Sequence, residues 1–423
     1  MSFTENWFSF VGGDRSPWLD FAGGRLELFF ALVFGFIGLM ALLYSVVKIR
    51  GRGGLVVEYF IFLVLMVASA IAVVYARNLL LIFAAWEVAT FVIWRLVLYY
   101  RADDDVGAAS WAWFVNFGAA TLMLVGMAII LFEEKTLSLD QLRGAEISAL
   151  PAVLIFIGIL AKSATMPLYV WLPKAYKAAP APVCAILSGI AENIGIVLFL
   201  KLFVMTVRVP DTFMSTVAGL AIVSSLVAGG IALRASTLRG LLAYSTISQL
   251  GFIFLGLAMV SYYGLLGGLL YVLAHAVAKA GLFFSAGMIE DAAGIGELDS
   301  LGGASRRAPV LAVATALLML SIVGMPPLLG FFAKLGVLMG ALEGNLMLGV
   351  GAILAALFTL LYMIRLYTKA FLGEPKPPAW QPVSGFLTAL VVILALVSLA
   401  GGIAAFGPID LLQSDVLKLV GGV

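Results

Sequence analysis

The chain has 423 residues, of which 63% are hydrophobic and 11% are charged, and its formal net charge is +2. About a quarter of the residues in a typical soluble domain are charged, so this composition excludes an ordinary soluble protein. The small net charge gives no reason to expect a nucleic-acid partner. We therefore expect an all-α polytopic membrane protein whose surroundings are a lipid bilayer.

The scarcity of metal-binding side chains limits the chemistry of the chain. It has one cysteine, Cys184, and one histidine, His275. A single cysteine excludes an internal disulfide and an Fe–S cluster held by this chain alone. There is also no glycine-rich nucleotide-binding motif. We therefore expect no cofactor in this chain, and we assign any Fe–S, NiFe, flavin or quinone centre to partner subunits.

Apolar windows of roughly 20 residues predict about twelve transmembrane helices. Residues 1–26 contain several charges and no apolar centre, which indicates an extramembrane N-terminal segment. We expect a transmembrane domain over 27–407, with a first half over about 55–206 and a second half over about 213–371, and a C-terminal tail over 408–423. The predicted spans cover residues 27–47, 55–76, 79–100, 108–132, 150–173, 182–206, 213–233, 241–260, 262–289, 308–341, 345–371 and 384–406.

Two of these spans contain prolines and are expected to be discontinuous. The span over 150–173 contains Lys162 followed by Pro167 and Pro173, and the span over 308–341 contains Gly324-Met325-Pro326-Pro327 before a lysine. Proline removes a backbone donor and clashes with the preceding turn, so it breaks or kinks a helix. The broken spans occupy similar places in the two halves, which is the pattern of inverted repeats in transporters.

Four ionisable side chains lie inside apolar runs: Glu87, Lys162, Lys279 and Lys334. Each costs roughly 2.5–3.5 kcal/mol at the centre of a bilayer, so such groups usually mark an ion or proton pathway. His275 lies one helical turn before Lys279 and, with an ordinary pKa near 6.5, can take and release protons. The loops on one side carry about twelve Lys and Arg against about seven on the other, which predicts that both termini lie outside.

Several segments together resemble one family of membrane proteins. These are LLLIFAAWEVATFV (79–92), AKSATMPLYVWLPKAYKA (161–178), LAYSTISQLGF (242–252), YVLAHAVAKAGLFFSAG (271–287) and SIVGMPPLLGFFAK (321–334). They resemble the antiporter-like subunits of respiratory complex I, membrane-bound hydrogenases and Mrp-type Na⁺/H⁺ antiporters. The resemblance implies that the chain lacks the first two of the family's usual fourteen helices, and that it resides in a prokaryotic cytoplasmic membrane.

The resemblance also implies roles for the ionisable residues. Glu87 is expected to be the carboxylate of the first half-channel, with Lys162 as its partner. Moving a carboxylate away from a buried lysine favours proton release, so such a pair can act as a switch. His275 and Lys279 are expected on the central hydrophilic axis, and Lys334 matches the lysine from which protons leave.

The chain departs from the family pattern at the centre. Many relatives carry a lysine where this chain has Asn193, beside Glu192, and many carry a second histidine where it has Tyr271. Three interpretations stay open. Water and Glu192 replace the lysine; the ion is Na⁺, which suits carboxylate and amide oxygens; or the protein conducts poorly and is structural.

The expected function is that of a proton-translocating, antiporter-like subunit in a multisubunit, redox-driven membrane complex resembling complex I or a membrane-bound hydrogenase. Its partners are then other membrane subunits of a hetero-oligomer and H⁺, with Na⁺ as the alternative ion. Two other functions remain open: a subunit of an Mrp-type cation/proton antiporter without redox partners, and a non-conducting subunit that bridges others.

Overall fold

The computed structural model describes residues 8–10, 20–49, 53–100, 103–376, 380–404 and 406–421. Most of the described chain is helical, which confirms the all-α prediction. Its elements are β1 (Phe8–Phe10), β2 (Phe21–Gly23), α1 (Arg25–Lys48), α2 (Gly53–Tyr75), α3 (Leu79–Val97), α4 (Asp103–Glu134), α5 (Ala149–Lys162), α6 (Trp171–Ala178), α7 (Ala181–Ile186), the π-helix η1 (Leu187–Ala191), α8 (Glu192–Phe199), the π-helix η2 (Leu200–Val204), α9 (Asp211–Ala232), α10 (Leu238–Ala258), α11 (Tyr262–Ala293), the 3₁₀-helix η3 (Leu298–Ser300), α12 (Ala304–Arg307), α13 (Pro309–Val323), α14 (Leu329–Gly344), α15 (Leu346–Ala370), α16 (Gly385–Ile403) and α17 (Phe406–Gly421).

The helix ends follow local sequence signals. Thr237 and Ser261 precede α10 and α11, and each side chain accepts a hydrogen bond from the backbone N–H three residues later. Such caps satisfy one of the amide groups that a helix start leaves unpaired. At the other end of α11, Gly294 adopts the left-handed conformation (φ +71°) that glycine tolerates without strain. Short polar residues therefore mark where these two helices begin, and a glycine marks where α11 ends.

The structure contains the expected set of membrane spans. Among the described residues, ten helices are long and apolar enough to cross a membrane. Two further spans are broken as predicted: α5 ends at Lys162 and α6 resumes at Trp171, while α13 ends at Val323 and α14 resumes at Leu329. With these two, the bundle has about the twelve spans that apolar windows of roughly 20 residues predict. The protein is an integral membrane protein.

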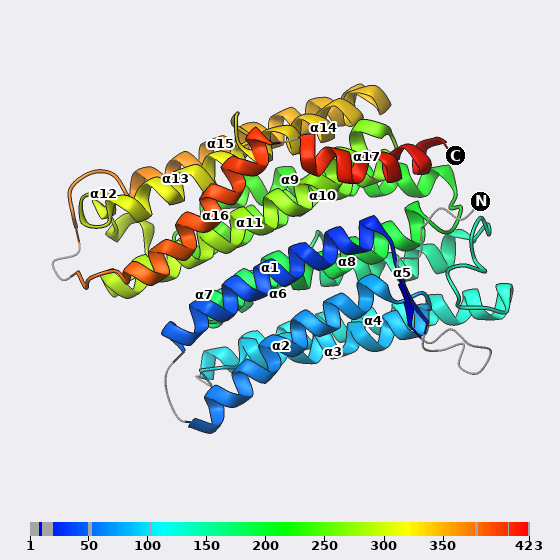
Figure 1. Ribbon diagram of the computed structural model, residues 1–423, viewed down its shortest axis with the longest axis horizontal. Helices are drawn as coiled ribbons and strands as arrows, with labels where there is room; N and C mark the ends of the chain where they lie inside the picture. Colours follow the sequence, from blue (N-terminus) through cyan, green and yellow to red (C-terminus); the bar gives the residue numbers. More distant parts are fainter. Residues whose placement is uncertain are drawn as a thin grey trace.

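The two broken spans occupy equivalent places in two successive stretches of chain. The stretch from α2 to η2 contains three continuous spans, a broken span and one more, and the stretch from α9 to α15 repeats this order. Because the first stretch crosses the membrane an odd number of times, the second runs in the opposite direction, as an inverted repeat requires. Figure 1 shows the two stretches as neighbouring layers, with α1 lying between them.

Helix α11 is the core of the second half, where it packs against α10, α13, α14 and α16. Its contact with α14 is close because both helices present glycine. A Cβ added at Gly267 would lie 2.3 Å from the backbone nitrogen of Val337, so only glycine fits there. Small residues let membrane helices approach in this way, where lipid gives no hydrophobic driving force between them.

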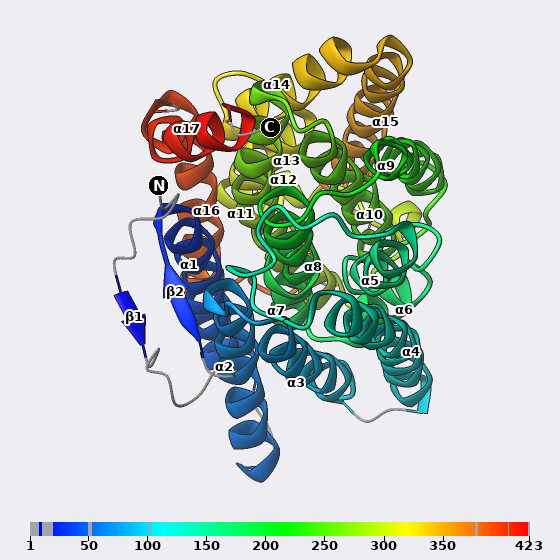
Figure 2. The ribbon, with the colours of Figure 1, turned by 90° about the vertical axis from the view of Figure 1, so that its right-hand side faces the viewer.

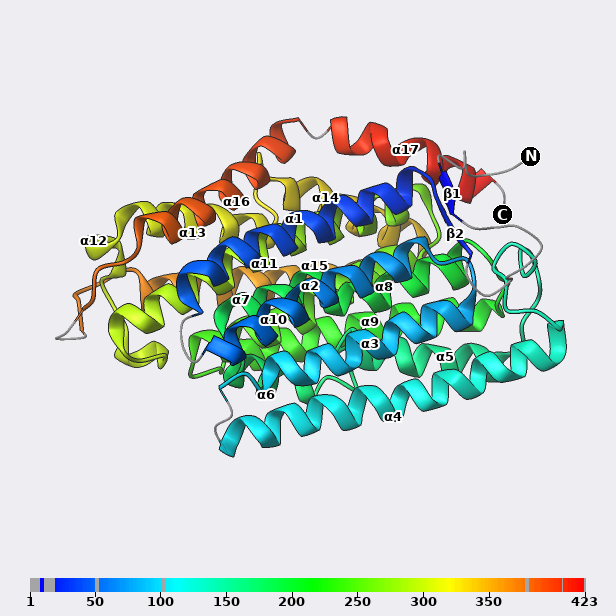
Figure 3. The ribbon, with the colours of Figure 1, turned by 60° about the horizontal axis from the view of Figure 1, so that its bottom comes forward.

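The ends of the chain differ in part from expectation. Residues 408–423 are not a simple tail, because most of them form α17, which packs against α11 and α1. Isoleucine, leucine and valine residues recur along one face of α17, and a helix buries such a face against neighbours. Most of the predicted extramembrane segment over 1–26 lies outside the described residues, apart from the β1–β2 hairpin and the start of α1. Figure 3 shows that α1 begins at the same end of the bundle as α17.

Candidate functional site

Lys162 is the last residue of α5 and is completely buried at the first helix break. Its Nζ donates hydrogen bonds to the Thr90 Oγ1 at 2.5 Å and to the Trp86 carbonyl oxygen at 3.3 Å, both on α3. It also lies 5.0 Å from the centre of the Trp86 ring, a distance at which a cation is attracted to the ring face. The lysine is therefore held by neutral groups of the neighbouring helix.

Glu87 lies on α3 between these two partners of the lysine, and its side chain is half-buried. Its carboxylate does not form an ion pair with Lys162 within 4.0 Å. One oxygen, Oε1, is buried without a hydrogen-bond partner among the described residues. The structure thus brings the expected carboxylate and lysine to one place, with Thr90 and the α3 backbone as the direct contacts of the lysine.

Glu192 is completely buried in the middle of the sixth span, directly after the π-helix η1. The Tyr176 hydroxyl of α6 donates to its Oε1 at 2.5 Å, while Oε2 has no hydrogen-bond partner among the described residues. Its backbone oxygen accepts from the Ser163 Oγ at 2.8 Å, beside the first break. Both segments of the broken span, before and after the break, therefore contact this glutamate. π-helical turns inside α-helices often occur at functional sites.

Asn193 is the residue at the expected position of a family lysine, and its side chain bonds to the backbone of its own helix. Its Nδ2 donates to the carbonyl oxygens of Ser188 and Gly189, at 3.3 and 3.0 Å, and its Oδ1 is buried and unpaired in the part of the chain that the structure describes. The amide therefore does not bridge to another helix. Its free oxygen and that of Glu192 are places where ordered water is expected, because buried polar atoms are nearly always hydrogen-bonded.

His275 and Lys279 lie one turn apart on α11, and both are completely buried. The Lys279 Nζ donates to the Ser245 Oγ at 2.7 Å and to the Leu242 carbonyl oxygen at 3.1 Å, both on α10. Neither ring nitrogen of His275 has a hydrogen-bond partner among the described residues. An imidazole needs at least one partner when it is buried, so this position too is expected to bind water.

Lys334 is the ionisable residue of the second break. It lies on α14 and reaches back to the end of α13, where its Nζ donates to the Ile322 carbonyl oxygen at 2.7 Å and to that of Val323 at 3.4 Å. A positive charge is favoured at a helix C-terminus, where carbonyl groups are left unpaired. The same Nζ lies 4.7 Å from the centre of the Phe252 ring. The lysines at the two helix breaks therefore have different contacts: Lys162 bonds to the neighbouring helix α3, and Lys334 bonds within its own span.

Most of the elements that carry these residues form a row across the bundle. In Figure 2, which looks along the helices, α3, α8, α11 and α14 follow one another, and α5, which ends at Lys162, lies beside this row. We refer to their side chains as the ionisable line, which comprises Glu87, Lys162, Glu192, His275, Lys279 and Lys334. Among the described residues, no carboxylate lies within 4.0 Å of any of its three lysines.

Sequence reasoning missed the neutral residues that contact the ionisable line. Thr90 and Tyr176 lie within or beside segments that carry the family resemblance, as does Gln249, but their contacts depend on which helices become neighbours. Tyr362 of α15 had no sequence signal at all. Its hydroxyl accepts from the Ser245 Oγ at 3.2 Å and from the Gln249 Nε2 at 2.6 Å.

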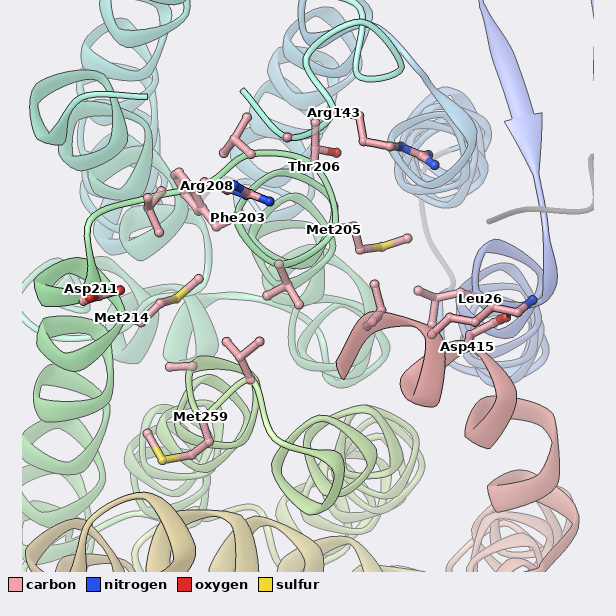
Figure 4. Close-up of a pocket in the computed structure, with 18 of the residues that line it drawn as sticks. Leu26, Arg143, Phe203, Met205, Thr206, Arg208, Asp211, Met214, Met259 and Asp415 are labelled. Atoms are coloured by element: carbon pink, nitrogen blue, oxygen red, sulfur yellow. Dashed lines mark ion pairs between the residues drawn. The ribbon is translucent and has the colours of Figure 1, made fainter. Parts of the chain in front are cut away.

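A cavity lies away from the ionisable line, at the end of the bundle where α1 begins. It has a volume of about 1070 Å³ and is lined by helix ends and the loops between them. Figure 4 shows Arg143, Arg208, Asp211 and Asp415 around it, with Met214 among its apolar side chains. Its charges are of both signs, and none of the ionisable line borders it. The described residues also contain no cluster of three or more His, Cys, Asp and Glu able to hold a metal ion.

Comparisons with known proteins agree with the resemblance found in the sequence. The family described as NADH:quinone oxidoreductase/Mrp antiporter, transmembrane, matches residues 76–359. NADH-quinone oxidoreductase subunit N of Parvibaculum lavamentivorans is 29% identical over 370 residues, covering 85% of this chain and 77% of that protein. One of the Na⁺/H⁺ antiporter subunits of Alkalihalophilus pseudofirmus is 28% identical over 455 residues, covering 96% of this chain and 56% of that protein.

The fold is similar to a chain in the structure of the Mrp complex from Dietzia sp., with a TM-score of 0.88 at 24% identity, covering 96% of this chain and 85% of that one. Membership is decided by the sequence match, which spans well over half of the chain. All six residues of the ionisable line lie inside the matched range. The chain belongs to the NADH:quinone oxidoreductase/Mrp antiporter transmembrane family.

Proposed function

We propose that this chain is a proton-translocating, antiporter-like subunit of a multisubunit, redox-driven membrane complex. The observation that carries the proposal is the environment of its buried lysines. Lys162, Lys279 and Lys334 are held by hydroxyl and carbonyl oxygens, and none has a carboxylate within 4.0 Å among the described residues.

This environment suits a lysine that exchanges its proton. A buried ion pair would hold the lysine in its charged form, because an uncompensated buried charge is costly. Hydroxyl and carbonyl oxygens accept hydrogen bonds from an ammonium and from a neutral amine. The contacts therefore persist whether the lysine carries its extra proton or has released it, which is what a relay requires.

Glu87 would then modulate Lys162 from α3, and Glu192 would take the place of the family lysine at the centre. Tyr176 connects Glu192 to α6, so a shift of the broken span would change the hydrogen bonding of the central carboxylate. Water bound at Glu192, Asn193 and His275 would complete the bridge between the halves. Of the three interpretations of the centre, this arrangement supports the one in which water and Glu192 replace the lysine.

The partners would be other membrane subunits, and the complex would be hetero-oligomeric. Moving one charge against 100 mV costs about 2.3 kcal/mol, so transport must be coupled to a driving reaction. Among the described residues no group of three or more His, Cys, Asp and Glu could hold a metal ion, and we assign the Fe–S, NiFe, flavin or quinone chemistry to those subunits. The excess of basic residues on one set of loops supports placing both termini outside a prokaryotic cytoplasmic membrane.

A role in an Mrp-type antiporter is the second candidate function, and the likeness to the chain of the Dietzia Mrp complex favours it. The test of both is purification of the native complex through a tag on this chain, followed by reconstitution into liposomes with an entrapped pH dye. Redox-active partners and proton movement that persists without Na⁺ support the first proposal, whereas transport that needs a Na⁺ gradient and no electron donor supports the second. In either case Lys162→Met should abolish transport while the complex assembles, and normal transport by this variant would contradict both.

A further inference from the structure

The second half contains a hydrogen-bonded connection that links two residues of the ionisable line. It begins at Lys279, whose Nζ donates to the Ser245 Oγ at 2.7 Å, and Ser245 donates in turn to the Tyr362 hydroxyl at 3.2 Å. It ends at the Ile322 carbonyl oxygen, which accepts from the Lys334 Nζ at 2.7 Å. The side chains of this connection are buried, so bulk water does not compete for their hydrogen bonds.

Gln249 and Tyr271 join the two ends. The Gln249 Nε2 donates to the Tyr362 hydroxyl at 2.6 Å and to the Thr359 Oγ1 at 3.1 Å, which directs the amide oxygen toward α11. There, Oε1 accepts a hydrogen bond from the Tyr271 hydroxyl. The same hydroxyl lies 3.4 Å from the Ile322 carbonyl oxygen, the acceptor that it shares with the lysine of the second break.

The amide in this connection does not pass protons. A hydroxyl accepts a proton on its oxygen and gives up the one that it carries, so serine and tyrosine can relay. A glutamine accepts only at its oxygen and donates only at its nitrogen. Passing a proton through Gln249 would leave it as the unstable imidic acid. Gln249 therefore holds the Tyr271 hydroxyl in place and conducts nothing itself.

Tyr271 has two ionisable neighbours outside this connection. It lies four residues before His275 on α11, hence on the same helix face one turn away. The Lys334 Nζ lies 5.8 Å from the centre of its ring. The Tyr271 side chain thus has the unpaired imidazole one turn along its own helix and the lysine of the second break near its ring, while its hydroxyl contacts Gln249.

We propose that Tyr271 is a further residue of the proton pathway, whose hydroxyl turns from Gln249 to Lys334, and that Gln249 is its positioning residue. This inference rests on the proposed function. In the step, the Tyr271 O–H bond breaks as an N–H bond forms on the neutral Lys334 amine. The tyrosine oxygen takes a proton from the His275 imidazolium, directly or through water, so that no tyrosinate remains. His275 becomes neutral and regains its proton from the side of Lys279.

The test is proton transport by the purified complex in liposomes, driven by its own reaction and read by an entrapped pH dye. Tyr271→Phe keeps the ring and removes the hydroxyl, and it should slow transport roughly 100-fold, the low end for a positioned proton-transfer group. Tyr271→His supplies another group that relays protons near neutral pH, and it should keep transport within about threefold of wild type. Tyr59→Phe removes a buried hydroxyl bonded to Ser45 on α1 and should leave transport unchanged.

Gln249→Met tests the positioning role. It should slow transport roughly two- to tenfold, as expected for the loss of the one hydrogen bond from Gln249 that holds the Tyr271 hydroxyl. The double variant that combines Gln249→Met with Tyr271→Phe should transport protons no more slowly than Tyr271→Phe alone, because Gln249 acts only through the Tyr271 hydroxyl. Losses that multiply would overturn the inference, since they would mean that Gln249 contributes separately. If Tyr271→Phe fails to assemble, the Tyr271→His and Gln249→Met variants decide by the same criteria.

Lys334→Met separates this inference from the proposed function. If Lys334→Met abolishes transport while Tyr271→Phe is normal, only the role of Tyr271 is overturned. If both variants transport normally, the role of Tyr271 and the proposed function are both overturned. Equal loss in Tyr271→Phe and Tyr271→His would also overturn the relay, because it would show that the site requires the shape of tyrosine and not a proton-transfer group.

Discussion

The hydrogen bond between Tyr176 and Glu192 offers the sharpest test of the centre of the ionisable line. Tyr176→Phe removes the only side-chain donor that contacts this carboxylate among the described residues, since Oε2 is already unpaired. The ring would stay against Phe283, whose centre lies 4.5 Å away, so packing should change little. A hydrogen bond to a charged group contributes about 1.5–3 kcal/mol. At about 1.4 kcal/mol per factor of ten, the ionised form of Glu192 becomes roughly ten- to 140-fold less populated.

If Glu192 must ionise in every transport cycle, proton movement by this variant should fall by roughly tenfold or more. The assay is dye-monitored proton uptake by liposomes that contain the purified complex, with assembly checked by size-exclusion chromatography. Tyr59→Phe is the matched control, because it also removes a buried hydroxyl with one side-chain partner. Transport by Tyr176→Phe within about twofold of this control would refute the role of Glu192, since the lost bond would then have no bearing on a charge change.

Three further predictions concern the packing and the lysine contacts. Thr90→Val should slow transport about two- to tenfold in the same liposome assay, because it removes the 2.5 Å hydrogen bond from Lys162. Thr90→Ser keeps a hydroxyl and should keep the wild-type rate. Equal transport rates in the two variants would contradict a role for this hydrogen bond. Lys201→Met should lower the free energy of unfolding by about 1–3 kcal/mol, because it leaves unpaired the carbonyl oxygens of Val73, Val74 and Ala76, to which Lys201 donates. The measurement is thermal unfolding in detergent, and an unchanged midpoint temperature of unfolding would disprove that role. Gly267→Leu should prevent folding because it forces α11 and α14 apart. Gly118→Leu is the control, since its added side chain meets open space, and it should fold normally when both variants are expressed and purified in parallel. Folding of both variants would show that the close approach of α11 and α14 is dispensable.

Four members of the ionisable line were predictable from the sequence because each interrupts an apolar run, whereas Glu192 was singled out only through the family resemblance. A charge in a membrane span is costly whatever the tertiary arrangement, so Lys162, Lys279 and Lys334 stand out without any structure. The break positions were predictable for the same local reason, since Pro167 and the pair Pro326-Pro327 cannot continue a helix. The predicted limits of most spans agree with the observed helices, because apolar length alone determines how much chain crosses the membrane.

The contacts of these charges were not predictable, because they join helices that are distant in the chain. Lys162 contacts Thr90 across 72 residues, and Lys279 contacts Ser245 across 34. Nothing in the local sequence decides whether a buried lysine meets a carboxylate, a hydroxyl or a carbonyl. The expectation that Lys162 is the partner of Glu87 rested on the resemblance, whereas the hydrogen bonds of Lys162 to Thr90 and to the Trp86 carbonyl oxygen are visible only in the structure.

Local features of the sequence therefore specify the class of the protein, the number of spans, the two breaks and the ionisable side chains within the spans, because apolar length, proline and charge act locally. The contacts of Tyr176 with Glu192 and of Gln249 with Tyr271, and the packing of α17 against α1 and α11, arise only in the folded bundle. These outcomes depend on which helix faces meet, and that is determined by side-chain packing over the whole bundle and not by any single segment.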